Sequence, residues 1–391
     1  MHVAILGTYP PTRCGIATFT ADVERSLREL GTKVTVIGVD PDDVAEGPFV
    51  HRFDPSSYAK AANWANNSDV DVVLVQHEFG VYGGPDGEML LRFTGALRVP
   101  YVVTFHTVLS PFQPNQSLVM EALCASAAAV TVFTPTARNM LVEQEICPAT
   151  LIQIVPHGAP IELYEPVDEI AARMSFGLPS TGPIVSTFGL LSAGKGIEVA
   201  IRALAKVVID DPDTRYVIAG RTHPEVVRRD GERYRDSLVQ LVSELGLEES
   251  VVFLDRFLSV EDLARLLAIT DVFCTPYHGA GQIVSGALTF ALAAGCPVVS
   301  TPYRYASDVL ADGAGLLVEF NDCDGMAAAI STLVEDGPTR TAALAAAQRY
   351  ASGASWPAVG QTLRTVLSQA LSRVRSLRSP SSTTPVLSCS A

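Results

Sequence analysis

Short, almost wholly apolar runs alternate along the chain with segments whose apolar residues recur at helical spacing. The first run, Val3–Leu6, is followed by apolar residues three or four positions apart, which are Ile16, Phe19, Val23, Leu27 and Leu30. Uninterrupted apolar runs are typical of strands buried on both faces. The spacing that follows predicts an amphipathic helix ending at Gly31. The alternation therefore predicts an α/β fold with parallel sheets covered by helices.

The same alternation occurs twice. Further strands are expected in the first half around Val72–Val75, Tyr101–Phe105 and Val130–Phe133, and the pattern restarts near Pro183. We expect two doubly wound Rossmann-like domains facing a cleft, where ligands of such folds bind. The predicted division is an N-terminal domain at 1–160, a linker at 161–182, a C-terminal domain at 183–350, a helix at 351–377 and a disordered tail at 378–391.

Composition and charge narrow the classes of function. The net charge of −14 argues against a broad basic surface for nucleic acid. The seven scattered cysteines include no C-x-x-C pair and indicate free thiols in a reducing compartment. The start, MHVAILGTYPP, is a buried strand and not a signal peptide, and no apolar stretch reaches 18 residues. We expect a cytoplasmic protein, and only Arg364, Arg373, Arg375 and Arg378 leave weak contact with a membrane surface open.

One glycine-rich segment, FGLLSAGKGIE at 188–198, could cradle phosphates. It falls short of a P-loop because Gly196 stands where the magnesium-binding Ser or Thr belongs. A nicotinamide site is also a poor fit, because the first loop, GTYPPTRCG, is too long for G-x-G-x-x-G and contains two prolines. A sugar-nucleotide site is the third interpretation.

Five segments in order carry a specific resemblance. They are CGIATFTADVERSL, TFHTV, IVPHGAPIELY, FGLLSAGKGIEVAIRAL and DVFCTPYHGAGQIVSGALTFALAAGCPVVST. The chain to about Leu377 resembles a family 4 retaining glycosyltransferase of the GT-B type. The resemblance implies transfer of a hexose from a nucleotide-sugar donor to a hydroxyl acceptor. It also implies that no metal or other cofactor is needed and that the helix from Trp356 crosses back to the N-terminal domain.

The resemblance also implies which residues hold the donor diphosphate. Lys195 would supply charge, and a helix expected over Leu288–Ala294 would offer backbone N–H groups. Arg221, Arg256 or Arg304, each at or just after a strand end, could replace an arginine that the family usually carries where Leu190 stands. The predicted donor-binding residues are Arg13, Gly15, Lys195, Arg221, Ser285, Gly286 and Ala287.

Catalytic candidates lie at strand ends on the acceptor side and in the signature region. His106 follows the strand YVVTF, and Glu78 follows VVLVQH as a possible polar contact or base. Gln282 stands where the family has the first of two signature glutamates, and Phe290 stands at the second. Gln282 can hydrogen-bond a sugar hydroxyl, but Phe290 cannot bind ribose hydroxyls. His77 and Glu78 do not form an H-E-x-x-H zinc motif, because Val81 occupies its last position.

Three functions therefore stay open from the sequence. The first is an active transferase acting on a saccharide or small-molecule acceptor. The second is a degenerate GT-B protein that binds saccharide or nucleotide without turnover, and the third is a phosphorylase with free phosphate near Lys195. The donor base, the sugar, the acceptor and the oligomeric state are not fixed by these patterns.

Overall fold

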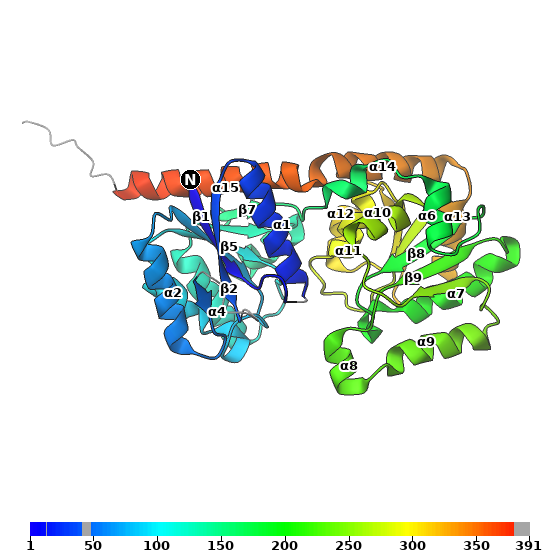
Figure 1. Cartoon of the computed structure of the whole chain (residues 1–391), viewed down its shortest axis with the longest axis horizontal. Helices are drawn as coiled ribbons and strands as arrows, with labels where there is room; N and C mark the ends of the chain where they lie inside the picture. Colours follow the sequence, from blue (N-terminus) through cyan, green and yellow to red (C-terminus); the bar gives the residue numbers. More distant parts are fainter. Residues whose placement is uncertain (13, 41–47, 379–391) are drawn as a thin grey trace, which may run out of the picture.

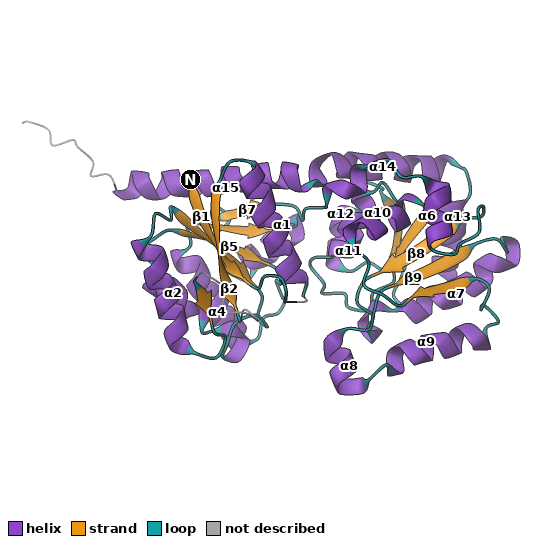
Figure 2. Cartoon of the chain, in the orientation of Figure 1, coloured by secondary structure: helices purple, strands orange, loops and turns teal. Residues whose placement is uncertain are grey.

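The computed structural model describes residues 1–12, 14–40 and 48–378. Within these residues two parallel β-sheets lie side by side, each covered by helices (Figures 1 and 2). The predicted α/β class with two doubly wound units is confirmed. Arg13 and the tail from residue 379 onward lie outside the described residues, so the predictions made for them remain predictions.

The first sheet has the strand order β3-β2-β1-β4-β5-β6-β7 in the described chain. Its strands are β1 (His2–Gly7), β2 (Lys33–Val39), β3 (Phe49–Val50), β4 (Val72–His77), β5 (Tyr101–Phe105), β6 (Ala129–Val132) and β7 (Ile152–Ile154). Every residue of β1 is buried, and Val3 pairs with Val34 on one side and Val72 on the other. The strand order reverses between β1 and β4, which is where such sheets bind ligands.

The second sheet has the order β10-β9-β8-β11-β12-β13 in the part of the chain described. Its strands are β8 (Ile184–Phe188), β9 (Arg215–Ala219), β10 (Val251–Leu254), β11 (Val272–Thr275), β12 (Val298–Ser300) and β13 (Gly315–Leu317). The order reverses between β8 and β11. The carboxyl ends of both sheets face the space between the two units, which places both switch points beside it (Figure 1).

Helices cover both sheets. Those of the first unit are α1 (Gly15–Glu29), α2 (Pro55–Asn67), η1 (Pro85–Gly87), α3 (Leu90–Ala96), α4 (Pro114–Ser126) and α5 (Pro135–Glu143). Those that follow are η2 (Ile161–Tyr164), α6 (Glu169–Ser175), η3 (Ala193–Lys195), α7 (Ile197–Asp210), α8 (Pro224–Asp230), α9 (Arg233–Glu244), α10 (Val260–Ala268), α11 (Gly286–Ala293), α12 (Arg304–Val309), α13 (Cys323–Val334), α14 (Pro338–Ala354) and α15 (Trp356–Arg378).

The chain passes between the two units at two places that lie side by side. Ala159 N donates to Ala354 O at 2.7 Å, and Trp356 N donates to Ala159 O at 2.9 Å. α15 then runs back along the first unit and packs on α1 and β6 (Figure 1). Among the described residues, none of the helices combines the length and the apolar character that crossing a lipid bilayer requires.

Candidate active site

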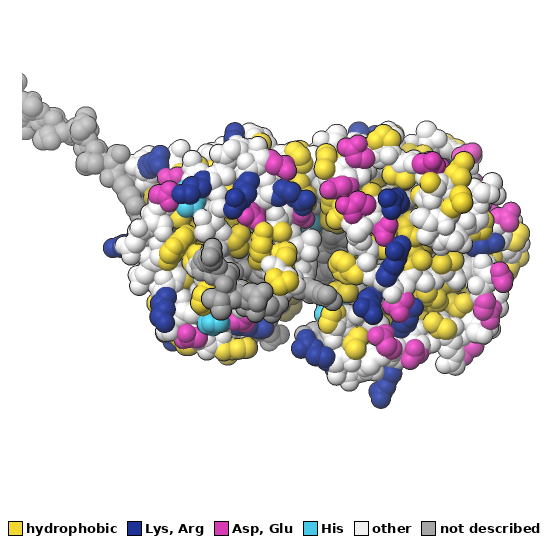
Figure 3. All heavy atoms as spheres, in the orientation of Figure 1, with side chains coloured by type: hydrophobic (Ala, Val, Ile, Leu, Met, Phe, Trp, Pro, Cys, Tyr) yellow, Lys and Arg dark blue, Asp and Glu magenta, His cyan; other side chains and the backbone are white. Residues whose placement is uncertain are grey.

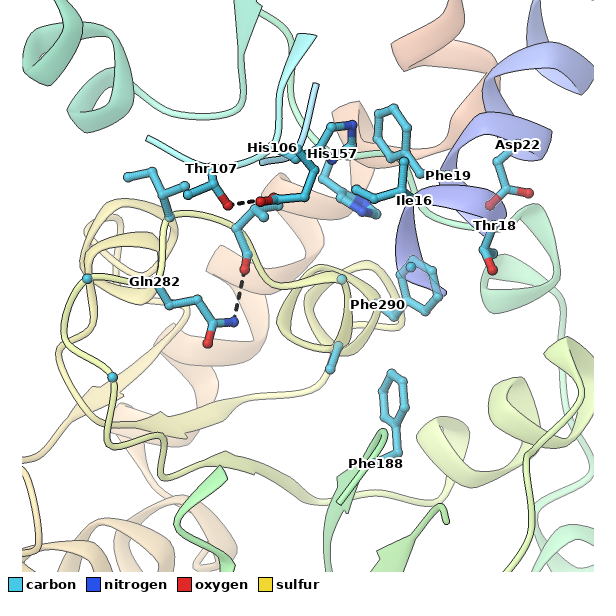
Figure 4. A pocket seen from close by; sticks show the side chains of 18 of the residues that line it. Ile16, Thr18, Phe19, Asp22, His106, Thr107, His157, Phe188, Gln282 and Phe290 are labelled. Carbon is cyan, nitrogen blue, oxygen red and sulfur yellow. Dashed lines mark hydrogen bonds between the residues drawn. The ribbon is translucent and has the colours of Figure 1, made fainter. Parts of the chain in front are cut away.

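A cleft of about 680 Å³ lies between the two units, and residues from both line it. Its N-terminal wall comes from α1 and from the loops that follow β4, β5 and β7. Its C-terminal wall comes from Phe188 at the end of β8, the loop after β11 and the start of α11 (Figure 4). On the face drawn in Figure 3, basic and acidic side chains are interspersed around the described surface.

His106 lies on the N-terminal wall as a neutral imidazole. It is 4% exposed, and burial lowers its pKa to about 3, helped by the neighbouring His157 and His77. Its Nε2 lies 2.8 Å from Gln76 Oε1, and a carbonyl oxygen only accepts, so Nε2 carries the ring proton. Phe19 packs edge-on against the ring, with centroids 4.7 Å apart. The histidine is therefore held in one tautomer beside the cleft.

Glu78 forms a second polar group on the same wall. Thr107 Oγ1 donates to Glu78 Oε2 at 2.6 Å (Figure 4). Phe79 N donates to Glu78 Oε1 at 3.0 Å. Burial raises the pKa of this carboxyl, while the two hydrogen bonds act in the opposite direction. Both predicted catalytic residues of the N-terminal wall thus line one cleft, and their catalytic roles stay predictions.

Aromatic rings join the two walls. His157 packs against Phe19 and Trp356 on one side, with centroids 5.2 and 5.9 Å away, and against Phe290 on the other at 6.1 Å. Phe290 stacks on Phe188, with centroids 6.3 Å apart. Phe19, His157, Phe290 and Phe188 therefore form a chain of neighbouring rings along the cleft (Figure 4), and Trp356 of α15 packs on His157.

The N-terminus of α11 faces the cleft through Gly286 and Ala287. Ser285 caps the helix, since its Oγ accepts from Leu288 N at 3.3 Å, and α11 therefore begins two residues before the expected Leu288. A Cβ on Gly286 would lie 3.6 Å from His157 Nε2, which marks how near the two walls come. Gly15, at the start of α1, lines the opposite side.

Gln282, Lys195 and Arg221 are placed differently from one another. Gln282 lines the cleft, and its Nε2 donates to Val284 O at 2.9 Å. Lys195 is half-buried outside the lining, with Nζ 3.9 Å from the ring centroid of Tyr277. Arg221 has an exposed side chain outside the lining, and its carbonyl accepts from Leu191 N at 2.8 Å. Their roles in donor binding stay predictions.

Two models of known protein families match this chain, one in each unit. Residues 168–350 match the model described as "Glycosyl transferases group 1", and residues 14–163 match the one described as "Glycosyltransferase Family 4". This chain belongs to glycosyltransferase family 4, also described as group 1. The glycosyltransferase is also 30% identical over 275 residues to a "GDP-mannose-dependent alpha-(1-6)-phosphatidylinositol monomannoside mannosyltransferase" of Mycolicibacterium smegmatis, covering 68% of each chain. The predicted family and the prediction of an enzyme are confirmed.

A further relative and a solved structure are similar over almost the whole length of the chain. A "Phosphatidyl-myo-inositol mannosyltransferase" of Mycolicibacterium smegmatis is 28% identical over 380 residues, covering 90% of this chain and 89% of that protein. The sucrose-phosphate synthase of Thermosynechococcus elongatus superposes with a TM-score of 0.76 at 18% identity, covering 95% of this chain and 100% of that one. Together they confirm the predicted GT-B fold of this glycosyltransferase.

Sequence reasoning missed part of the glycosyltransferase's cleft. Thr18 and Asp22 line it from α1, and Thr107 lines it beside Glu78. Asp22 is 6% exposed and forms an ion pair with Arg25, and burial raises its pKa to about 6 although that ion pair opposes the shift. Thr18 and Asp22 are four residues apart on a predicted helix, so the sequence could have shown that both lie on one helix face.

Proposed function

We propose that this glycosyltransferase moves a hexose from a nucleotide-sugar donor to a hydroxyl acceptor, with retention of anomeric configuration and without a metal ion. The observation that carries the proposal is a single cleft lined by both units, with the N-terminus of α11 on one wall and Glu78 and His106 on the other. Retention enters the proposal through the family resemblance. A cytoplasmic site of action enters it through the scattered cysteines, which indicate a reducing compartment.

Departure of the nucleoside diphosphate places negative charge near α11 in this proposal. The first N–H groups of a helix have no acceptor within the helix, so those of Gly286 and Ala287 are available to phosphate oxygens. Lys195 would add a full positive charge from the neighbouring loop. These two sources of positive potential support metal-free departure of the leaving group, because they act where a divalent cation would otherwise be needed.

The acceptor hydroxyl would approach from the N-terminal wall. The neutral His106 can accept a hydrogen bond at Nδ1, since Nε2 donates to Gln76. Glu78 can accept from a hydroxyl when ionised, and Asp22 provides a second carboxyl on α1. In the proposed reaction, the acceptor attacks the sugar from the side on which the diphosphate leaves. The leaving phosphate then takes the proton of the acceptor hydroxyl, so the role of these side chains is to orient the hydroxyls of the acceptor and the sugar.

Binding of nucleoside diphosphates without metal is the first test. Purified protein in EDTA is heated with GDP, UDP, ADP or their hexose conjugates, beginning with GDP-mannose because the 30% identical relative depends on it. We expect one nucleotide to raise the melting temperature by about 5 °C at hundredfold excess over Kd. Lys195→Met should lose most of this shift, whereas Lys60→Met, an exposed lysine on α2, should keep it. Equal shifts in both variants would contradict the proposed donor site.

A transfer assay with the identified donor then tests turnover and stereochemistry. The anomeric proton of the product, followed by NMR from the first minutes, should show the configuration of the donor. An inverted product would refute retention while leaving the donor site intact.

Binding without turnover is the second candidate. It is favoured by Phe290, which occupies the cleft where the family resemblance places a glutamate, and by the Gln282 amide, which is bonded to Val284 O. Nucleotide binding at Lys195, combined with no transfer to any acceptor and no donor hydrolysis, would support this function over the first.

A further inference from the structure

The Lys195 ammonium lies over an aromatic ring. Its Nζ is 3.9 Å from the ring centroid of Tyr277, which is within the range of a cation–π contact. Tyr277 follows β11 by two residues, and the same loop continues into Gly279 and Gln282, which line the cleft. The ring therefore places the ammonium at the border of the site.

The backbone around Lys195 is fixed to the same loop. His278 N donates to Gly194 O at 3.1 Å, and His278 Nε2 lies 2.8 Å from Glu198 Oε1. Gly196 has a φ of +59°, and a Cβ there would lie 2.0 Å from Pro276 O. Only glycine permits this approach, so the loop of Lys195 packs closely against the loop of Tyr277.

The ring of Tyr277 is itself held in place. It stacks on Tyr303 with centroids 5.0 Å apart and an interplanar angle of 18°, and both residues are at most 1% exposed. The hydroxyl oxygens of both tyrosines have no hydrogen-bond partner among the described residues. The ring of Tyr277 thus stacks on Tyr303 and lies under the Lys195 ammonium.

We propose that Tyr277 is a positioning residue that holds the Lys195 ammonium ready for the donor diphosphate. This inference rests on the proposed function, in which Lys195 binds that diphosphate. A free lysine side chain loses considerable rotamer entropy when it is fixed on a ligand, and a ring that already restrains it reduces this loss. An ammonium has three donors, so it can contact phosphate oxygens while it stays over the ring.

Titration of GDP, UDP and ADP into a set of Tyr277 variants tests this role. Tyr277→Leu should weaken binding of the tightest diphosphate by about fivefold, the size of one cation–π contact. Tyr277→Phe should stay within about twofold of the parent protein, because the hydroxyl forms no hydrogen bond among the described residues. In a Lys195→Met background, Tyr277→Leu should add less than about twofold, because the effect passes through the lysine.

A shape-conserving series guards against a folding defect in Tyr277→Leu. Phenylalanine analogues with one to three ring fluorines at position 277 weaken the charge on the ring face with little change in size. We expect affinity to fall stepwise along this series while the melting temperature stays constant. Flat affinity along the series, or an equal loss from Tyr277→Leu in both backgrounds, would overturn the inference. A Lys195→Met variant with parental affinity would instead refute the proposed function, and so would the absence of binding by any diphosphate.

Discussion

Three histidines of the N-terminal half, His77, His106 and His157, are buried as neutral rings. Burial is the main cause in each case and lowers their pKa values to about 3, about 3 and about 4. His77 is fully buried, packs edge-on between Phe79 and Phe105, and has no partner for either ring nitrogen among the described residues. In the unfolded chain these rings would titrate near their ordinary value of about 6.5.

Stability should therefore fall as the pH drops below about 6.5, because the unfolded chain then binds protons that the folded chain excludes. Asp22 opposes this trend, since its pKa is raised to about 6 in the folded state and its contribution to stability is lost as pH rises through that value. Burial also raises the pKa of the Glu78 carboxyl, so Glu78 opposes the histidines as Asp22 does. Because the histidines are more numerous and more strongly shifted, we expect a net loss of about 3 kcal/mol between pH 7 and pH 5, measured by urea unfolding.

The share of His77 can be isolated. In His77→Leu the loss between pH 7 and pH 5 should shrink by about 2 kcal/mol, because the variant has no ring to protonate in the unfolded state. An identical pH dependence in His77→Leu and the parent protein would show that this ring is not kept neutral by burial.

At the scale of the element, the proposed donor site lies at the capped N-terminus of α11. Gly286→Ala should keep the fold, because the new Cβ meets His157 at an ordinary van der Waals distance of 3.6 Å. The methyl group would stand where phosphate approaches the N–H groups, so diphosphate affinity should fall by about tenfold, the order of one lost hydrogen bond to a charged group. Calorimetric titration measures this loss. Gly353→Ala on α14 is the control, because a Cβ there would have no atom within 4 Å. It should leave diphosphate affinity unchanged and alter the free energy of unfolding by no more than about 1 kcal/mol.

Elements were predictable from the sequence where burial alone decides them. β5 has the expected bounds, because an apolar run in a parallel sheet is buried on both faces. α11 began earlier than its apolar residues indicated, because the Ser285 hydroxyl binds Leu288 N. Periodicity shows which face of α1 is buried but not what covers it, so Asp22 was missed. The contact of Lys195 with Tyr277 depends on two loops far apart in the sequence, and no local pattern encodes it.

At the scale of the whole molecule, the packing of α15 on α1 is close. Ser26 Oγ donates to Trp356 O at 2.6 Å. A Cβ on Gly360 would lie 1.9 Å from Ser26 Oγ. The α15 helix thus meets α1 at a point where only glycine fits. Arg364 Nη1 extends the contact by donating to Leu30 O at 2.7 Å.

Gly360→Ala should force the two helices apart and lower the free energy of unfolding by about 2 kcal/mol, as overpacking of a tight contact does. Hydrogen exchange should quicken along α15 before it does in α14. Adding Ser26→Ala removes the clashing oxygen and should restore part of the lost stability. A double variant no more stable than Gly360→Ala alone would mean that the contact with Ser26 is not the cause.

The return of α15 to the first unit also sets an order for synthesis on the ribosome. The first sheet and α1 are complete once Ala159 has been made, yet the apolar face of α1 that meets Val359 and Leu363 stays uncovered until roughly 200 residues more have emerged. At about 5–20 residues per second this interval lasts roughly 10–40 s. A nascent chain of this protein therefore carries an unfinished hydrophobic surface through half of its translation, and a ribosome that stalls before Trp356 leaves it exposed.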